Sequence, residues 1–574
     1  MNSVHKKQRL LGNVCGQGVS GLAMITAEHA FLPDLLHPIA RSRIDREHTR
    51  VALVMAFAGG SGGGLFADAL DKAESSDSSW DATTFARDLF LGRFVAEGFR
   101  ARIGADEPQM CVNHLVRLLS HPPRDPAVVH YRRQILTELC DSPELRRNLE
   151  QLYRALCRLR GLLESTAGQS IDPNRRQLDT LVVVQKIIDL MATGFGAAGS
   201  GLQALAAFGM RVQRTEPYQA LSDLVRYDAQ LATLSLNVGV GADGRIRGFE
   251  VVSVKESADN PFVNSVWRRW AAKFELFLRG YRFSDGEVMA RLIDAVFSGV
   301  ENEIVAFVQL LGEIEFYLGA LGFRERAHAA GLEVCLPTLV DARAPRRLEG
   351  LFNPLLLFSG ITPVPCTIAT RSLAGTVLIT GPNSGGKTRL LQALAFTQLL
   401  AQAGSFIPAR AGSIALVPAL VVSLIEETKA DQTEGRLGME LMRIRALFER
   451  LPPGAMVLLD ELCSGTNPSE GEEIFELVVS TLARLEPQVF ITTHFLAFAA
   501  RLERERKIAG LGFLQVELGA DRRATFQFVE GVAQTSLAGH AAERLGVTRD
   551  QLDALVERNT QLFRAAKATA TGAH

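Results

Sequence analysis

The sequence predicts a multidomain protein, in which a mainly helical core or lever domain with a small β-hairpin precedes an α/β domain. Three observations support this fold class. The chain has 574 residues, too many for a single hydrophobic core. Apolar residues recur at helical spacing from about residue 85, with one stretch of strand-like alternation. Beyond about residue 345, strand and helix patterns alternate, which is typical of a mostly parallel sheet covered by helices.

Composition and charge are those of a soluble globular protein. Hydrophobic residues make up 47% of the chain and charged residues 22%, which argues against disorder as the main state. The formal net charge is −1, so any nucleic-acid contact must come from local basic patches. The seven cysteines include no C-x-x-C pair, which favours reduced thiols over zinc or disulfides. With no apolar run typical of a secretory signal near Met1, we expect a cytoplasmic protein.

Two charge-free stretches raise the question of a membrane. Val51 to Ala67 contains five glycines, and Leu190 to Met210 is long enough to span a bilayer but is rich in Gly and Ala. Such composition is typical of tightly packed soluble helices, so we expect no stable membrane association. The alternative is a membrane-associated scaffold anchored by Leu190 to Met210.

The first part of the chain divides into an N-terminal extension of unclear role, residues 1–84, and a helical domain, residues 85–345. The polar stretch Glu74 to Thr84 resembles a linker. Ser142 and Pro143 predict a helix start, after which six leucines form a heptad seam: Leu145, Leu149, Leu152, Leu156, Leu159 and Leu163. The arginines off this seam form either a solvated helix face or a nucleic-acid contact: Arg146, Arg147, Arg154, Arg158 and Arg160.

Two further elements make the helical domain a lever. Leu231 to Val254 alternates apolar and polar residues around an Asp243-Gly244 turn, which predicts a β-hairpin. Its Arg245 and Arg247 either keep an edge soluble or contact a partner. A capping box at Ser284 begins a helix that continues to about Leu321, roughly 50 Å long. Gly299 and Gly312 are positions where that helix could kink.

The α/β domain is expected over residues 346–535, with C-terminal helices at residues 536–574. The predicted strands are Gly375 to Thr380, Ala419 to Ile425, Met456 to Leu459 and Val489 to Thr493. The predicted helices are Thr388 to Leu400, Glu440 to Leu451 and Glu470 to Arg484. Ligands bind to sheets of this kind at the carboxyl ends of the strands.

A glycine-rich turn follows the first of these strands. Its residues fit the spacing G-x-x-x-x-G-K-[ST] of a nucleotide-binding P-loop: Gly381, Pro382, Asn383, Ser384, Gly385, Gly386, Lys387 and Thr388. Glycines let successive backbone N–H groups face a phosphate, and the following helix adds the positive end of its dipole. Lys387 would reach the terminal phosphates of ATP, and Thr388 would bind Mg²⁺.

The next strands supply the remaining groups of an ATP-hydrolysing site. The strand Met456 to Leu459 ends in Asp460 and Glu461, which predicts a metal ligand and a group that orients or deprotonates water. His494 follows the strand Val489 to Thr493 and is placed to contact the γ-phosphate. These motifs occur in the order of one nucleotide site, a P-loop ATPase domain of the ABC type. A nucleotide kinase fits less well, because the acid pair and the histidine favour water as nucleophile.

These residues resemble the ATPase domain of the MutS mismatch-repair family. The resemblance rests on TGPNSGGKT, on QLLAQAGSFIPA from Gln398, on LLDELCSGTNPSEG from Leu458 and on ITTHF from Ile491. The GTNPSEG portion is closer to the second bacterial MutS branch. Weaker similarity covers HPPRDPAVVHYRRQILTEL from His121, EIEFYLGALGF from Glu313 and the C-terminal segment from Ser536, which in the family helps to hold a dimer.

The chain departs from the family pattern in two regions. The first 150 residues contain no Phe-x-Glu mismatch reader, so direct mispair recognition is not expected. A C-terminal Smr-like nuclease module is not expected either. The family's Ser-Thr-Phe element, presented to the partner's nucleotide, should fall near Asp431 to Glu440. There the chain has DQTEGRLGME, and the candidates for this contact are Thr433, Gly435, Arg436 and Gly438.

The resemblance implies a homodimeric, Mg²⁺-dependent ATPase that binds DNA as a clamp, on branched or otherwise non-mismatch structures. In that hypothesis, loss of the γ-phosphate shifts the clamp between states. The alternative is a ribosome- or RNA-associated ATP-driven conformational switch, which the second MutS branch makes credible. DNA binding that weakens steeply with salt distinguishes the two.

Overall fold

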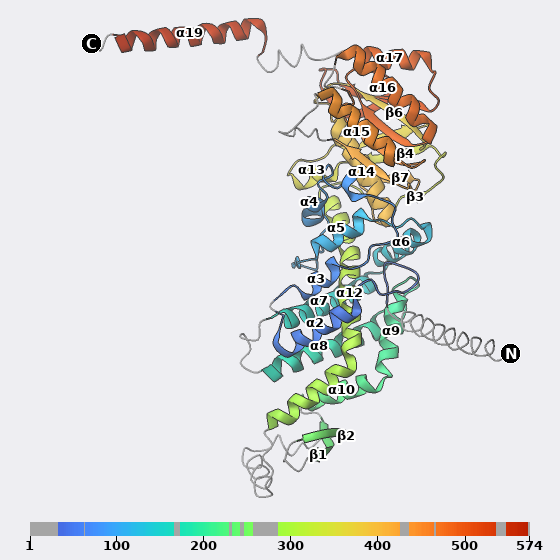
Figure 1. Ribbon diagram of the computed structural model, residues 1–574, viewed down its shortest axis with the longest axis vertical. Helices are drawn as coiled ribbons and strands as arrows, with labels where there is room; N and C mark the ends of the chain where they lie inside the picture. Colours follow the sequence, from blue (N-terminus) through green and yellow to red (C-terminus); the bar gives the residue numbers. More distant parts are fainter. Residues whose placement is uncertain are drawn as a thin grey trace, which may run out of the picture. The chain divides into compact units, whose positions relative to one another are not determined.

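The computed structural model describes residues 33–61, 63–165, 173–228, 232–240, 246–256, 285–424, 436–463, 467–534 and 547–571 (Figure 1). Contacts divide the chain into two compact units. Unit 1 takes the described residues of Met1–Ser78, Gly92–Arg326 and Gln402–Ser405. Unit 2 takes those of Ser79–Leu91, Ala327–Ala401 and Phe406–His574. The four functional domains expected from the sequence stay a prediction, because this division rests on contacts alone.

Unit 1 is mainly helical. Its first helices, in chain order, are α2 (Arg46–Gly59), α3 (Leu65–Asp71), α4 (Leu91–Arg93), the π-helical turn η2 (Phe94–Gly98), α5 (Val112–Ser120) and α6 (Pro126–Asp141). The following helices are α7 (Pro143–Glu164), α8 (Pro173–Gly194), α9 (Gln203–Gln213), α10 (Glu216–Asp228) and α12 (Asp285–Ala329). Ser142 caps α7, since its hydroxyl accepts a hydrogen bond from Leu145 N. All six leucines of the predicted seam are buried along α7.

Helix α12 is the longest described element, with 45 residues and a length of about 67 Å. It runs eight residues past the predicted end at Leu321. Gly299 and Gly312 do not interrupt it. Gly312 instead allows close packing, because a Cβ there would lie 2.7 Å from His114 Nε2. A Cβ at Gly322 would lie 1.8 Å from the carbonyl oxygen of Arg100. These glycines therefore let neighbouring segments approach the helix.

The described residues contain one helix long and apolar enough to cross a membrane, the Met289–Ala329 part of α12. The apolar window that qualifies it is entirely buried inside the protein, as in the core helix of a soluble protein. The proposed anchor Leu190 to Met210 is wrong as a span. Its residues divide between α8, which ends at Gly194, and α9, which begins at Gln203, so they form no single helix.

The predicted hairpin is present in unit 1. Strands β1 (Ala232–Val240) and β2 (Ile246–Glu256) pair antiparallel, with Ala232 opposite Glu256 and Val238 opposite Phe249. Arg245 lies outside the described residues, and the role of Arg247 stays a prediction. On α7, the predicted basic face is largely engaged within unit 1. Arg154 and Arg160 donate to the carbonyl oxygens of Ile103 and Gln109, and Arg146 pairs with Glu150 and Glu325.

Unit 2 contains a six-stranded sheet of order β12-β11-β6-β10-β9-β8. Its strands are β6 (Gly375–Thr380), β8 (Leu420–Ser423), β9 (Met456–Leu459), β10 (Gln488–Thr492), β11 (Leu511–Leu518) and β12 (Ala524–Glu530). All neighbours pair parallel except β11 and β12. The four predicted strands are confirmed, with ends shifted by at most two residues at β8. Strands β11 and β12 were not predicted.

Helices and a second sheet complete unit 2. The helices are α13 (Pro354–Phe358), α14 (Lys387–Ala403), α15 (Arg436–Arg450), α16 (Pro468–Leu482) with the short turn η4 (Ala483–Leu485), α17 (Leu496–Glu505) and α19 (Arg549–Thr571). A four-stranded sheet of order β3-β7-β4-β5 was not predicted. Its strands are β3 (Thr338–Leu339), β4 (Arg346–Leu351), β5 (Cys366–Thr370) and β7 (Ala411–Ile414). Buried Leu378, Val457 and Ile491 form a core with Phe475 and Phe498 of the covering helices.

The segment predicted as a linker, Glu74 to Thr84, divides between the units, and its part from Ser79 packs into unit 2. Ser79–Leu91 includes the 3₁₀ turn η1 (Ala82–Thr84) and buries Trp80, Phe85 and Leu89. The Trp80 indole donates a 3.0 Å hydrogen bond to the carbonyl oxygen of Val417. The polar composition of Glu74 to Thr84 had suggested a linker without packing contacts. Of these three buried apolar side chains, Trp80 lies within the predicted linker, and Phe85 and Leu89 follow it.

Candidate functional site

Three neighbouring parallel strands bring the predicted site residues to one edge of the six-stranded sheet. In the order β6-β10-β9, the glycine loop follows β6, Thr493 and His494 follow β10, and the acid pair follows β9. Because the strands are parallel, their carboxyl ends meet at the same edge. Buried apolar residues along all three strands fix their register, for example Leu378 opposite Ile491.

The glycine loop adopts backbone conformations that require glycine. Gly381 has φ 135° and Gly386 has φ 85°, values that L side chains rarely adopt. A Cβ at Gly381 would also lie 2.7 Å from Val516 Cγ2. Helix α14 begins at Lys387, directly after the loop, so its first N–H groups and dipole face the loop's concave side. This is the geometry of an anion-binding turn.

Lys387 folds back over the loop. Its Nζ donates to the carbonyl oxygens of Gly381 and Pro382 at 2.9 and 3.1 Å. The residue is only 3% exposed. Burial lowers the pKa of Lys387, and the carboxylates of Glu461 and Asp460 act in the opposite direction. A buried cation at this position is suited to neutralise phosphate oxygens.

Thr388 and Asp460 form the second part of the site. The Thr388 hydroxyl donates to Asp460 Oδ2 at 2.5 Å, and the Thr492 hydroxyl donates to Oδ1 of the same carboxylate. Hydroxyl and carboxylate oxygens are hard ligands, which fit Mg²⁺ when phosphate and water oxygens complete its shell. The described residues contain no group of three or more His, Cys, Asp or Glu that could hold a metal. With one hydroxyl and one carboxylate, the Thr388–Asp460 donor set fits a nucleotide-bound Mg²⁺.

Glu461 and His494 are in direct contact. His494 Nε2 lies 2.5 Å from Glu461 Oε1, and their side chains are 34% and 39% exposed. Glu461 has φ 52°, an uncommon value for glutamate, and its backbone N–H donates to Thr492 Oγ1 at 2.8 Å. With a proton on Nε2, the histidine orients the carboxylate. The sequence predicted both residues at the site but not their pairing.

Two residues at this edge of the sheet were not predicted as site residues from the sequence. Thr492 bridges the acid pair through both hydrogen bonds described above, and its place in the ITTHF run was the available signal. Phe526 of β12 is 44% exposed and has φ 60°. Its ring carbon Cδ1 lies 3.2 Å from where a Cβ of Gly386 would be. Phe526 had no sequence signal, because β12 was not predicted.

The segment expected to reach a partner's nucleotide is described only in part. Thr433 and Gly435 lie outside the described residues. Arg436 begins α15, and Gly438 lies in its first turn. Glu440 of the same helix accepts a hydrogen bond from Cys463 N, so α15 is tied to the chain just after the acid pair. The assignment of these residues stays a prediction.

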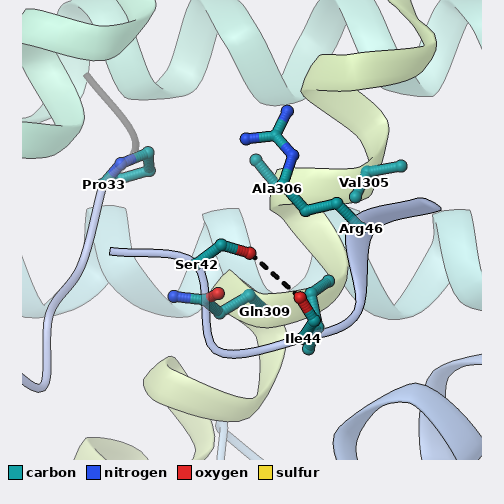
Figure 2. A pocket seen from close by; sticks show the side chains of 7 residues that line it. All are labelled: Pro33, Ser42, Ile44, Arg46, Val305, Ala306 and Gln309. Carbon is teal, nitrogen blue, oxygen red and sulfur yellow. Dashed lines mark hydrogen bonds between the residues drawn. The ribbon is translucent and has the colours of Figure 1, made fainter. Parts of the chain in front are cut away.

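A pocket in unit 1 lacks the chemistry of a reaction site (Figure 2). It lies between the segment around Ser42 and helix α12, and apolar Ile44, Val305 and Ala306 form much of its lining. The Ser42 hydroxyl already donates to the carbonyl oxygen of Ile44 at 3.1 Å. No carboxylate lines this pocket, so the sheet edge in unit 2 remains the candidate site.

Comparison with known proteins agrees with the geometry of unit 2. Residues 377–562 match the family model of MutS domain V. Over this range the chain is similar to the MutS family. The matched range begins in β6, which leads into the glycine loop, and contains that loop, the acid pair and His494. Every residue that the sequence assigned to the nucleotide site therefore lies inside the MutS domain.

Several relatives carry the name Endonuclease MutS2. The protein of Thermomicrobium roseum is 26% identical over 339 residues, which cover 57% of this chain and 40% of that protein. The Leuconostoc mesenteroides protein is 30% identical over 256 residues, covering 44% and 30%. The Streptococcus mutans protein is 31% identical over 242 residues, covering 42% and 29%. The chain thus spans less than half the length of these relatives.

Proposed function

We propose that this protein is a Mg²⁺-dependent ATPase that binds DNA as a dimeric clamp, on branched or otherwise non-mismatch structures in repair or recombination. The observation that supports this most strongly is the convergence of four groups at one sheet edge: the glycine loop, the Thr388–Asp460 pair, Glu461 and His494. Such an edge combines a phosphate cradle, oxygen ligands for Mg²⁺ and a base beside the phosphate.

In this proposal different residues bind the phosphates, hold the metal and activate water. Backbone N–H groups from Gly381 to Thr388 and the start of α14 bind the phosphates, and Lys387 neutralises their charge. Thr388 and Asp460 hold Mg²⁺, which when bound stabilises charge on the phosphate oxygens. Glu461 orients the attacking water and takes its proton, while His494 holds the carboxylate in place. Phe526 offers an aromatic face to the nucleobase.

Dimerisation is supported by the surface of α19. Four exposed apolar side chains of α19 lie toward one face of the helix: Leu552, Leu555, Val556 and Leu562. Leu555 and Val556 follow Leu552 by three and four residues, and Leu562 follows them by seven and six. A helix of 23 residues with one such apolar face is suited to pair with a second copy of itself. The resemblance of this segment to the family's C-terminal helices supports the same assignment.

Two similarities support DNA as the partner. The chain matches MutS domain V, and its relatives carry the name Endonuclease MutS2. With a net charge of −1, contact with DNA requires local basic patches. Duplex and branched DNA are to be titrated at several salt concentrations, with and without ATP. We expect affinity to fall steeply as salt rises and to change with ATP. No DNA binding at low salt would contradict this half of the proposal. A preference for structured RNA would favour the ribosome- or RNA-associated switch.

Hydrolysis is tested by release of phosphate from ATP with and without Mg²⁺. We expect turnover only with Mg²⁺, and loss of ATP binding in Lys387→Ala, because that variant removes the buried cation of the loop. Wild-type protein that binds no ATP would rule out the assignment of the site.

A further inference from the structure

The segment Ser79–Leu91, called the clip below, contacts the edge strand of the six-stranded sheet. β8 ends the sheet order, so among the described residues no strand pairs with its outer edge. Along this edge the clip satisfies main-chain groups with side chains. The Ser79 hydroxyl donates to Pro418 O at 2.5 Å, and the Thr84 hydroxyl lies 2.7 Å from Leu420 O. Covering an edge strand in this way also protects it from pairing with another chain.

Asp88 makes the contact closest to the nucleotide site. Its Oδ2 accepts a 2.7 Å hydrogen bond from Leu424 N, the residue directly after β8. Asp88 is 5% exposed, so the bond is shielded from water. On the opposite side of the strand, Ser423 O accepts from Asp460 N at 2.9 Å. The end of β8 is therefore held between the clip and the metal-binding carboxylate.

The clip also contacts the helix that carries the other metal ligand. Gln392, 3% exposed on α14, donates through Nε2 to the carbonyl oxygen of Asp88 at 3.4 Å. Gln392 accepts hydrogen bonds from Asn353 Nδ2 and Arg389 Nη1, both at 2.9 Å. Gln392 lies four residues after Thr388, one turn further along the same helix. Asp88 thus links the strand next to Asp460 with the first turns of the helix that bears Thr388.

We propose that Asp88 is a positioning residue of the ATPase site: it holds β8 and α14 so that Thr388 and Asp460 meet at the distance that Mg²⁺ requires. The inference rests on the proposed function, since the geometry it preserves is that of the metal site. Small displacements of such groups cost much catalysis, up to about 10²-fold for 1 Å. The carboxylate of Asp88 acts through Leu424, its backbone carbonyl oxygen acts through Gln392, and neither group binds the nucleotide.

The test compares Asp88→Ala, Asp88→Asn and Asp125→Ala with wild-type protein. Asn keeps an oxygen that can accept from Leu424 N. Asp125 is the matched control, because its carboxylate also accepts a backbone N–H, that of Ala127 at 2.8 Å, but at the start of α6 in unit 1. For each protein the measurements are kcat, KM for ATP, the Mg²⁺ concentration for half-maximal rate, and the urea midpoint of unfolding.

Asp88→Ala is expected to lower kcat about tenfold and to raise the Mg²⁺ requirement severalfold, with KM for ATP within about threefold of wild type. Asp88→Asn is expected to restore most of kcat, and Asp125→Ala to leave kcat and the Mg²⁺ requirement unchanged. A purely structural role would lower the urea midpoint without moving the Mg²⁺ requirement, and would overturn the inference. So would an Asn variant as impaired as the Ala variant.

A second variant decides the matter if Asp88→Ala does not fold. Thr84→Val keeps the shape of the side chain and removes the hydroxyl that contacts Leu420 O. We expect a smaller fall in kcat with the same rise in Mg²⁺ requirement, and an unchanged Mg²⁺ requirement would overturn the inference. Wild-type protein without Mg²⁺-dependent hydrolysis would refute the proposed function, whereas normal kinetics in the Asp88 variants would refute only the role of the clip.

Discussion

Glu315 on α12 is a buried acid outside the candidate site. Its carboxylate accepts hydrogen bonds from Cys111 N at 2.8 Å and from the Tyr153 hydroxyl at 3.0 Å, and Arg160 lies 4.0 Å away. Burial raises the pKa of Glu315 to about 7, although these partners act to lower it. The neighbouring Glu313 also has a pKa raised by burial. The folded protein therefore favours the neutral form of both acids.

This predicts a pH dependence of stability. Because the folded pKa of Glu315 is above its usual 4.5, its stabilising contribution is complete below about pH 4.5 and is lost as pH rises through about 7. The free energy of unfolding should fall over that window by at most about 1.4 kcal/mol per pH unit for each such group. Glu315→Gln, which mimics the neutral acid, should reduce the slope. Urea unfolding at pH 5 to 8 measures this slope for the wild type and for Glu315→Gln. Equal slopes in the two proteins would contradict the raised pKa of Glu315.

The proposed contact between Phe526 and the nucleobase predicts the effect of removing its ring on ATP binding. Removing its exposed ring from beside Gly386 should weaken contact with the base while leaving the phosphate chemistry intact. In Phe526→Ala we expect KM for ATP to rise by about tenfold with kcat changed little, since stacking contributes on the order of 1–3 kcal/mol. Phe526→Tyr serves as the control and should behave as wild type. Equal KM values in the Ala variant and wild type would refute the contact.

The sequence predicted the chemistry of individual residues better than their contacts. Lys387, Thr388, Asp460, Glu461 and His494 come together at one sheet edge, because each follows a strand whose apolar run was readable. The hydrogen bonds of Thr492 to the acid pair depend on the register between β10 and β9. That register is set by packing across the sheet, which no local pattern contains.

At the scale of elements, the glycines of α12 mark where other segments touch the helix. Gly312, Gly319 and Gly322 lack space for a Cβ, with neighbours at 2.7, 2.5 and 1.8 Å. The sequence suggested kinks, because glycine weakens a helix and the spacing alone does not reveal a neighbour. The long helix itself was predictable from its capping box and its apolar periodicity.

Gly322→Ala should be strongly destabilising for this reason. The added methyl would meet the backbone carbonyl oxygen of Arg100, which cannot move without shifting the chain, so we expect a loss of about 3 kcal/mol. Gly161→Ala on α7 is the matched control. A Cβ at Gly161 has no neighbour within 4 Å, so the change should be neutral or stabilising by up to about 1 kcal/mol. Thermal unfolding of the two variants measures the difference, and similar values would contradict the packing argument.

The short strands of the second sheet and the packing of the clip could not be predicted from the sequence. β3 has two residues and β7 four, too few to show alternation. The first part of the clip, up to Thr84, was predicted as a linker, since polar residues surround its buried Trp80. The clip is held by contacts with Val417 and with Leu420 of β8, more than 300 residues further along the chain.

At the scale of the whole molecule, the proposed dimer depends on the apolar face of α19. Leu555→Glu places a charge on that face, and we expect the dimer to dissociate, because burying an unpaired charge costs several kcal/mol. Gln561→Glu adds the same charge on the opposite face of α19 and should leave the dimer intact. Sedimentation velocity at several protein concentrations distinguishes the outcomes, and a dimeric Leu555→Glu protein would exclude α19 as the interface.

The central claim is that Glu461 activates water at an ATP site whose phosphate cradle works independently of it. Its most direct test is a pair of measurements on Glu461→Gln with Mg²⁺: equilibrium binding of ATP and single-turnover hydrolysis. We expect affinity within about threefold of wild type and a hydrolysis rate reduced by at least about 10²-fold, because the amide keeps the shape of the side chain but cannot take a proton. Hydrolysis at the wild-type rate would contradict the account.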